Sequence, residues 1–570
     1  MEGSKAVVES DLKRDVGIWG LFWASEGSII GSGWLFAGLY ATTLAGPSAL
    51  ISWGIATVII IILALVHAEL GGMFAVTGGT SRYPHYAYGS FAGASFGWFA
   101  YIQAASVAPI EVLATIQYFS SVSWASSWYK APVPPAINGT LSGAGIAVAV
   151  CLMILFTIIN LVGVRWLANS NNGITTWKVI VPIVAIIVFC AFHFHGHNFS
   201  AGGGFFVKGT DGGAHAILDA IPGAGIVFSL LGFEQAVQLG GEARNPQRDL
   251  PRAVISAILV GAAIYILAQV AFIAAISPSV LVHYHSWTGL AGDAGLEKAP
   301  FYTVAKLAGI TWLAYIFRID AVISPAGTGL IYLTSASRIS FGLSKNGYIP
   351  DAFEKTNRFK IPAFAVIISA LIGLLFLLPF PSWSSLVDIV TGASVLMYAA
   401  APLSLGALRK AKPDLAKLYT LPYGTVLIPL AFVCANLVVY WAGWNTYSTL
   451  MLVLIIGYII MAVSRMANAN KNQPKIDWGA APWILTYFVG LGFISFFGSF
   501  GTSAIIGGVG PFSGVWIGGD GRLPLWWDIL VVAVFSLVIY FWAVSSRLPE
   551  EEIDQYIGTV VVISDPELMH

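Results

Sequence analysis

Residues 29–34 read Ile-Ile-Gly-Ser-Gly-Trp and stand in the middle of a long apolar stretch near the N-terminus. Two glycines around a serine are poor helix formers, so a helix through this stretch is expected to break here. If the stretch lies in lipid, its freed backbone groups need partners, and such backbone is tolerated only against a cavity or packed protein. Small residues also suit close helix packing. Taken alone, the stretch leaves both interpretations open.

The composition places the chain in a membrane. Of its 570 residues, 57% are hydrophobic and only 10% are charged, whereas soluble domains carry about 25% charged residues. A chain this long and apolar is expected to use lipid as its solvent. Its net charge of zero says nothing about partners, but no basic tail or block is present that would suggest nucleic acid. The three cysteines lie far apart inside apolar runs, so we expect buried thiols and neither a metal site nor a cofactor.

Fourteen segments are long and apolar enough to be spanning helices, which need about 20 such residues. The sequence therefore predicts an all-α integral membrane protein with about 14 transmembrane helices. The predicted segments are residues 17–44, 48–75, 93–124, 143–163, 172–192, 216–240, 252–277, 308–341, 362–380, 384–408, 422–441, 446–467, 481–500 and 525–545. The connection 278–307 is long enough to carry short surface helices.

The positive charges predict the orientation. Most of the 28 Lys and Arg residues fall in connections that are cytoplasmic if the N-terminus is inside. We therefore expect a multi-pass protein of the prokaryotic inner membrane with both termini in the cytoplasm. The acidic stretch 547–570 is expected to be a flexible cytoplasmic tail.

A second interrupted segment accompanies the first. Residues 221–225 read Ile-Pro-Gly-Ala-Gly, and a serine, a glycine and Glu234 follow within the same predicted helix. The two interrupted helices are the first and the sixth, which are the first members of two five-helix halves. Paired interruptions at matching positions indicate a transporter built from inverted repeats, with its substrate near the bilayer midplane. Freed amides and the positive helix ends suit a carboxylate, and freed carbonyls suit an ammonium group.

Four strings of residues carry a family resemblance. They are IIGSG at 29–33, GFEQAVQLGGEARNPQRDLPRAV at 232–254, AELGGMFAVTGGTSRYPHYAYG at 68–89 and SPAGTGLIYLTSASRISFGLSKNGYIP at 324–350. The chain resembles the amino acid–polyamine–organocation superfamily of permeases, well over the first ten predicted helices and weakly over the last four. The resemblance implies a five-plus-five inverted repeat with the first and sixth helices broken, alternating access, and an amino acid or related organic cation as substrate.

The resemblance also divides the chain into four parts. These are a cytoplasmic N-terminus at 1–16, a transport core at 17–410, accessory helices at 411–546 and a cytoplasmic tail at 547–570.

The resemblance further implies a substrate site at the two breaks. The substrate carboxylate would lie against Gly31, Ser32 and Gly33. Its amino group would lie against the carbonyls of Phe228, Ser229, Leu230 and Leu231. Phe228 and Phe233 are candidate aromatic gates, although plain packing explains them equally well. Ile30, Leu231 and Phe233 would form an apolar wall, which favours neutral substrates.

Ionisable side chains at membrane depth are costly, so each is a functional candidate. Lys178 either snorkels to the headgroups or exchanges a proton. The resemblance favours proton exchange, because proton-coupled relatives have a lysine in this helix where sodium-coupled relatives hold a sodium ion. Ser324 and Thr328 would be the neighbours of Lys178. Glu234 and Glu111 are further proton-coupling candidates.

Three other charges receive weaker interpretations. Glu26 is expected nearer to the headgroups than to a site. Arg318 and Asp320, two residues apart, do not face each other along a helix, so each needs another partner. Glu111 and Glu234 would favour basic substrates, whereas Arg318 would favour acidic ones if it reached the site.

These observations predict a secondary transporter that imports amino acids, with proton symport as its coupling. The alternatives are an exchanger of amino acids or amines, and a transporter of the same fold that carries a cation or a nucleobase. The sequence shows no nucleophile elbow, P-loop or HExxH motif, so we do not expect an enzyme. The expected partners are the amino acid, the proton and membrane lipid.

Overall fold

The structure of the chain is a computed structural model. It describes residues 6–8, 16–75, 79–130, 139–162, 164–208, 212–240, 243–359, 361–378, 382–413, 415, 419–501, 521–558 and 562–563. Nearly all of the predicted N-terminal segment 1–16 lies outside these residues, as do residues 564–570 of the predicted tail.

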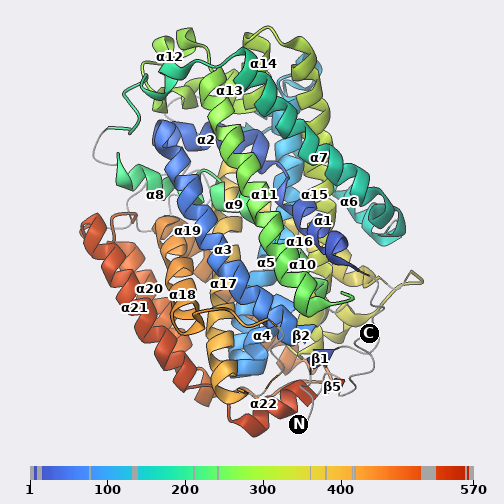
Figure 1. The fold of residues 1–570 in the computed structure, drawn as a ribbon. Coiled ribbons are helices and arrows are strands. Elements are labelled where there is room, and N and C mark those ends of the chain that lie inside the picture. The colour runs from blue at the N-terminus through green and yellow to red at the C-terminus, as the bar shows by residue number, and fades with distance from the viewer. Residues whose placement is uncertain are drawn as a thin grey trace.

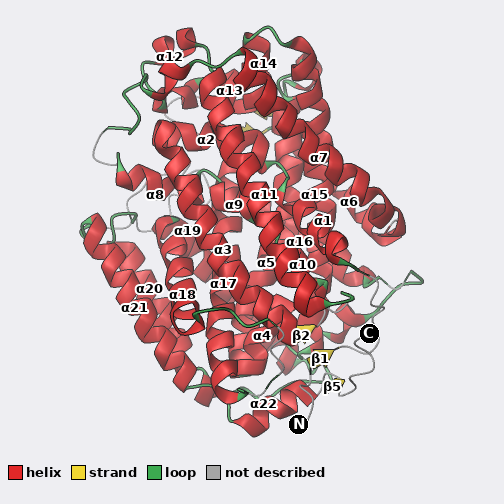
Figure 2. Cartoon of the chain, viewed as in Figure 1, coloured by secondary structure: helices red, strands yellow, loops and turns green. Residues whose placement is uncertain are grey.

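Helices account for almost all of the regular structure (Figure 2). They are α1 (Ile18–Ile29), α2 (Gly33–Ala45), α3 (Ala49–Met73), α4 (Gly79–Tyr88), α5 (Ser90–Phe119), α6 (Gly143–Val162), α7 (Val164–Phe192), α8 (Ala214–Gly223), α9 (Ile226–Leu230), α10 (Glu234–Gln238), α11 (Pro246–Ala275), α12 (Pro278–Tyr284), α13 (Ala294–Lys298), α14 (Pro300–Leu307), α15 (Thr311–Lys345), α16 (Ala363–Phe376), α17 (Trp383–Ala411), α18 (Gly424–Trp441), α19 (Gly443–Met466), α20 (Pro482–Phe497), α21 (Leu525–Ser545) and α22 (Glu550–Gly558).

Five short strands complete the described structure. They are β1 (Ala6–Val8), β2 (Phe74–Ala75), β3 (Tyr129–Lys130), β4 (Thr140–Leu141) and β5 (Val562–Ile563). Strand β1 pairs in parallel with β2 and antiparallel with β5, so segments near the two ends of the chain meet in one small sheet. Strands β3 and β4 form a separate antiparallel pair.

Helices occupy every segment predicted to span the membrane. Within the described residues, ten helical stretches are long and apolar enough to cross a membrane, and α16 and α20 are shorter apolar helices. The largest difference in a boundary is at α7, which begins at Val164 rather than near residue 172. Two predicted segments are split: 17–44 holds α1 and α2, and 216–240 holds α8, α9 and α10.

The outer faces of the bundle are apolar. Ile158 of α6, Ile187 of α7 and Val538 of α21 are each more than half exposed. These helices lie at the periphery of the bundle in Figure 1, whereas α5 packs extensively against α15 and α17 in the interior. Such faces would be unfavourable in water and are suited to lipid. The chain is thus a multi-pass membrane protein.

Short helices cover one end of the bundle, as predicted for the connection 278–307. Helices α12, α13 and α14 lie together at the top of Figure 1. Glu297 of α13 is buried; its Oε1 accepts a hydrogen bond from Tyr129 Oη at 2.5 Å, and its backbone oxygen accepts one from Gln117 Nε2 at 2.8 Å. Burial raises the pKa of Glu297 from its ordinary 4.5 to about 7.

The opposite end of the bundle corrects one expectation. The tail was expected to be flexible, but Glu550–Gly558 forms helix α22, whose Ile553 and Ile557 are buried. Ion pairs fasten this segment: Lys475 Nζ lies 2.9 Å from Glu552 Oε1, and Lys412 Nζ lies 2.7 Å from Asp554 Oδ2. Apolar residues at a spacing of four give α22 one face that buries against the bundle.

Near this end, a buried ion pair joins α3 to α17. Arg409 Nε donates to Glu69 Oε1 at 2.7 Å, and Arg409 Nη2 donates to Glu69 Oε2. The amide of Leu421 donates to the same carboxylate at 2.8 Å. Glu69 is completely buried and therefore depends on these donors, in agreement with the structural role that its position near the end of a helix suggests.

We expect Arg409→Met to lower the free energy of unfolding by about 3 kcal/mol, because Glu69 would keep a buried charge without its cation. Thermal unfolding of purified protein in detergent measures the effect. The double variant Glu69→Gln, Arg409→Met is the control and should recover most of the loss. Equal stability of Arg409→Met and the wild type would contradict a structural role for the pair.

We expect the stability of the wild type to fall by up to about 3 kcal/mol between pH 4.5 and 7.5 relative to Glu297→Gln. The folded protein keeps the Glu297 proton up to about pH 7, whereas the unfolded chain releases it near 4.5. The stabilisation from this proton is therefore complete below pH 4.5 and is lost as the pH rises through 7. Chemical unfolding at several pH values measures it, and parallel curves for the two proteins would show that Glu297 does not titrate in this window.

Candidate functional site

The first break separates α1 from α2. Helix α1 ends at Ile29, the backbone of Ile30 is extended, and α2 begins at Gly33. The extended backbone interrupts the helical hydrogen-bond ladder in the middle of a buried segment. The Gly-Ser-Gly sequence thus gives a real interruption rather than only a close packing surface.

Side chains from four other helices satisfy the backbone at this break. The Gly27 oxygen accepts from Lys178 of α7, and the Ile29 oxygen accepts from Tyr265 of α11 at 2.8 Å. Thr328 of α15 lies 3.4 Å from the Ile30 oxygen. The Ser32 amide donates to Glu111 Oε2 of α5 at 2.9 Å.

The second break separates α8, α9 and α10. Gly225 adopts the left-handed region with φ of +76°, and Gly232 has φ of +132°. Both conformations favour glycine, which explains why these residues stand where the helix stops. Ser229 Oγ donates to the Gly225 oxygen at 2.7 Å, and the Phe228 oxygen accepts from the Leu231 amide at 3.2 Å.

The two breaks lie against each other. A Cβ atom added at Gly232 would come within 2.7 Å of the Ile29 nitrogen. One added at Gly33 would come within 2.3 Å of Ser229 Oγ. Since such distances are shorter than van der Waals contact, both glycines are needed for this approach. The structure therefore brings together the two sets of residues predicted to hold the substrate.

Lys178 lies beside the first break and is completely buried. Its Nζ donates to the Gly27 oxygen at 2.5 Å and to Thr328 Oγ1 at 2.7 Å. These contacts join α7 to α1 and α15. The contacts do not agree with snorkelling to the headgroups, because a snorkelling ammonium group would reach water.

The other predicted neighbour of Lys178 has a different partner. Ser324 Oγ donates to Asp320 Oδ1 at 2.7 Å. Asp320 is fully buried and also accepts from Trp34 Nε1 at 2.9 Å and Trp177 Nε1 at 3.0 Å. These three hydrogen-bond donors are neutral, and Asp320 also interacts electrostatically with Lys178. Arg318 donates instead to the Tyr302 hydroxyl and stacks over that ring, 4.2 Å from its centroid.

Glu111 approaches the first break from α5. Its Oε2 accepts from the Ser32 amide, while its Oε1 is buried without a hydrogen-bond partner. A Cβ atom added at Gly31 would lie 2.6 Å from this Oε1 and 2.9 Å from Thr328 Oγ1. The Glu111 carboxylate thus already accepts from the Ser32 amide, which is one of the amides expected to bind the substrate carboxylate.

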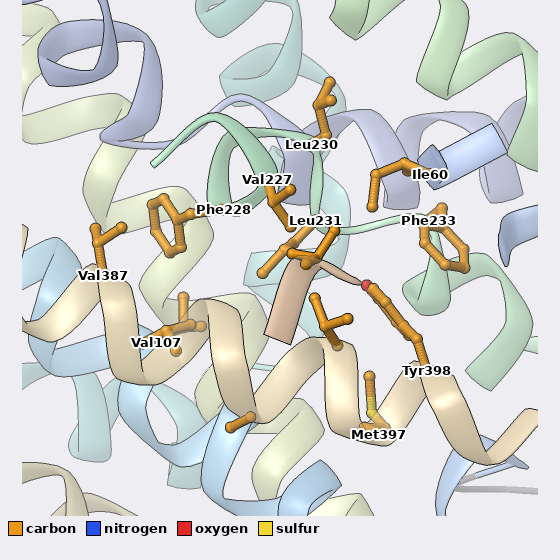
Figure 3. Packing of buried hydrophobic residues seen from close by; sticks show 14 of the residues in the cluster. Ile60, Val107, Val227, Phe228, Leu230, Leu231, Phe233, Val387, Met397 and Tyr398 are labelled. Atoms are coloured by element: carbon orange, nitrogen blue, oxygen red, sulfur yellow. The ribbon is translucent and has the colours of Figure 1, made fainter. Parts of the chain in front are cut away.

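Glu234 begins α10 and joins three elements on the other side of the second break. Its Oε2 accepts from the Gly232 amide at 2.9 Å and from Tyr398 Oη at 2.6 Å. Its Oε1 accepts from Tyr332 Oη at 2.8 Å. Figure 3 shows Phe233, next in the chain to Glu234, and Tyr398 of α17 facing each other across this part of the core. Their rings are 4.8 Å apart.

An aromatic cluster covers the first break from α17. Trp383 Nε1 donates to Ser32 Oγ at 2.8 Å, and the Trp383 ring stacks on Phe36 and Tyr40 at 5.2 and 5.5 Å. Phe228 meets the same indole edge-on at 5.8 Å. Phe228 thus belongs to the cover over the break, while Phe233 packs on Tyr398 and His67 instead.

Sequence reasoning missed several residues of this site. Glu26 was expected nearer to the headgroups, but it is completely buried and interacts electrostatically with Lys178, so that expectation was wrong. Trp383, Tyr265 and Tyr398 were not singled out, because an aromatic residue in an apolar helix looks like ordinary core. Within the described residues, no group of three or more His, Cys, Asp or Glu side chains suits a metal ion.

The family now follows from a direct comparison. Residues 16–463 match the family described as amino acid permease. The chain belongs to this family, which confirms the resemblance seen in the sequence.

Three curated relatives show the range of the family. The chain is 34% identical to the glutamate/serine transporter AimA of Bacillus subtilis over 95% of both chains. It is 33% identical to the aspartate-proton symporter of the same organism, over 96% of this chain and 99% of the relative. It is 24% identical to the serine/threonine exchanger SteT, over 73% of this chain and 87% of that protein.

We expect Gly31→Ala and Gly33→Ala to weaken amino-acid binding by tenfold or more, because the added methyl groups would collide with Glu111 and Ser229. Competition binding on purified protein measures the loss. Gly54→Ala is the matched control, since a Cβ atom there meets nothing within 4 Å. Unchanged affinity in both site variants would show that the two breaks need not keep their present approach.

Proposed function

We propose that the protein imports amino acids across the membrane by alternating access, with proton symport as its coupling. The observation that carries the proposal is the completely buried Lys178 ammonium group, which joins α1, α7 and α15 at a helix break. By the family resemblance, a lysine in this helix takes the place of the sodium ion that sodium-coupled relatives hold. A lysine can perform this role reversibly, because its ammonium group can release and regain a proton.

The substrate groups have defined positions in this proposal. The carboxylate lies at the amides of Gly31, Ser32 and Gly33, and the ammonium group at the carbonyls of the α9 segment, residues 228–231. Positive helix ends and unwound carbonyls are the means by which transporters bind both groups. Ile30, Leu231 and Phe233 form the apolar wall.

Glu111 links the proton to the substrate. As long as its carboxylate accepts from the Ser32 amide, a second carboxylate at that amide meets a negative charge. A proton on Glu111 removes this charge and weakens its hydrogen bond to the amide. Glu111 and Lys178 also interact electrostatically, so the two groups act as a pair in this proposal. Glu234 is the third proton-coupling candidate, held at the second break.

The architecture belongs to the same proposal. Fourteen spans, of which α1–α2 and α8–α10 are the broken first and sixth, form a five-plus-five inverted repeat followed by four accessory helices. The transport core then comprises residues 17–410 and the accessory helices residues 411–546. Both ends of the chain lie in the cytoplasm, and α22 belongs to the tail at 547–570.

Exchange of two amino acids is the second candidate. It is favoured by the similarity to a serine/threonine exchanger, and in this case Lys178 would keep its charge through the cycle. The names of the relatives are those of transporters, so we infer that the protein is not an enzyme.

Uptake into proteoliposomes tests the coupling. We expect an inward proton gradient to stimulate uptake of labelled amino acids without sodium, and Lys178→Ala and Glu111→Gln to abolish this stimulation. Gly54→Ala serves as the control for reconstitution. Uptake that does not depend on the proton gradient, but requires an amino acid preloaded inside the proteoliposomes, would favour exchange instead. A requirement for sodium would contradict the proton proposal.

A further inference from the structure

One buried acid has no part in the function proposed above. Glu26 of α1 is completely buried, and it stands one residue before Gly27, whose oxygen accepts from Lys178. Among the residues that the structure describes, neither Oε1 nor Oε2 of Glu26 has a hydrogen-bond partner. A buried carboxyl group that accepts from no donor is rare in folded proteins and calls for an explanation.

The lack of donors separates Glu26 from the other buried acids near the breaks. Glu111 accepts from a backbone amide, Glu234 from one amide and two tyrosine hydroxyls, and Asp320 from two indoles and a hydroxyl. These hydrogen bonds hold the three carboxyl groups in place. A carboxylate at membrane depth is costly without such contacts, so Glu26 needs either a proton or a nearby cation.

The surroundings of Glu26 supply the cation. Helices α7, α10, α11 and α15 pack against α1. Lys178 of α7 and Tyr265 of α11 interact electrostatically with Glu26. The Tyr265 hydroxyl donates to a backbone oxygen of α1, whereas Glu234 of α10 and Asp320 of α15 accept from donors of their own. Lys178 is therefore the charged group with which Glu26 can exchange a proton.

The place of Glu26 along α1 gives the exchange a direction. Glu26 lies eight residues after the start of α1 at Ile18, which corresponds to about 12 Å along the axis, and α1 ends at Ile29. Glu26 thus stands between the N-terminal end of the helix and the break. With the N-terminus in the cytoplasm, as proposed above, water that enters from the cytoplasm would meet Glu26 before it meets the break.

We propose that Glu26 is the proton acceptor through which Lys178 releases its proton to the cytoplasm. The inference rests on the proposed function, because it assumes proton symport and a cytoplasmic N-terminus. The Glu26 carboxylate takes a proton from the Lys178 ammonium group, directly or through one water molecule, which leaves a neutral amine and a neutral carboxyl group. The carboxyl group then gives this proton to water on the cytoplasmic side and becomes a carboxylate again.

This step is needed for net uptake but not for exchange. When one amino acid enters and another leaves, the proton can stay on Lys178 throughout. Net uptake instead leaves the site empty, and the carrier returns outward only after its proton has left. A Glu26 that served only as a counter-charge for Lys178 would affect both modes, because both need the ammonium group at the break.

Two assays of the full-length protein in proteoliposomes test the inference. One measures net uptake driven by an inward proton gradient, and the other measures exchange against a preloaded amino acid at equal pH on both sides. In Glu26→Gln we expect net uptake to fall about tenfold or more, while exchange stays within about twofold of the wild type. Glu26→Asp keeps a carboxyl group and should recover part of the net uptake.

Asp320→Asn is the matched control, because Asp320 is also buried and also interacts electrostatically with Lys178. Its carboxylate accepts from Trp34 of α2, beyond the break, so it does not lie on the route to the cytoplasm. Any loss in Asp320→Asn should therefore fall equally on net uptake and on exchange.

The outcomes separate this inference from the proposed function. Equal losses in both assays of Glu26→Gln, or no loss in either, would overturn the role of Glu26 and leave proton symport standing. A selective loss of net uptake in Asp320→Asn would overturn it as well. Wild-type uptake that does not respond to the proton gradient would overturn both proposals. If Glu26→Gln does not fold, Glu26→Asp decides: reduced net uptake with intact exchange supports the inference, and any other pattern overturns it.

Discussion

The need to pair backbone groups inside lipid governs this structure. Where α1 stops at Ile29, its amides and carbonyls lose helical partners in a place that water does not reach. Side chains from α5, α7, α11 and α15 replace those partners one by one. The break thus links these four helices to α1. Any of them that moves must break its hydrogen bond to the break, and the freed backbone group then needs another partner. A substrate with a carboxylate and an ammonium group offers such partners.

The charged groups around the breaks follow from the same constraint. Lys178 satisfies a carbonyl, Glu111 satisfies an amide, and Glu234 satisfies the amide of Gly232. Each is therefore a structural partner and a titratable group at once. Under the proposed function, a change of protonation at Lys178 or Glu111 alters which backbone groups are paired and so connects the site with the positions of the helices. Trp383 adds a cover whose hydrogen bond ends on Ser32, within the break itself.

The amino-acid order alone predicted the helices well, because spanning segments are long and uniformly apolar. It also predicted both breaks, since Gly-Ser-Gly at 31–33 and Gly225 are locally poor in helix propensity. The side chains that pair with the backbone at the breaks were harder to predict. Tyr265 and Trp383 act through single hydrogen bonds from apolar helices, and their depth and direction depend on packing that has no local signal. Glu26 was misplaced because distance along a helix says little about tilt.

Helix α22 joins distant parts of the chain at one edge of the bundle. Its ion pairs reach the segments after α17 and after α19, Tyr556 donates to Asp477 at 2.9 Å, and the Asp477 carboxylate accepts from the Ser90 amide at the start of α5. These interactions join four segments of the chain at this edge. Under the proposed alternating access, the segments joined at this edge have the least freedom to separate, so the wider movement is expected at the opposite end of the bundle.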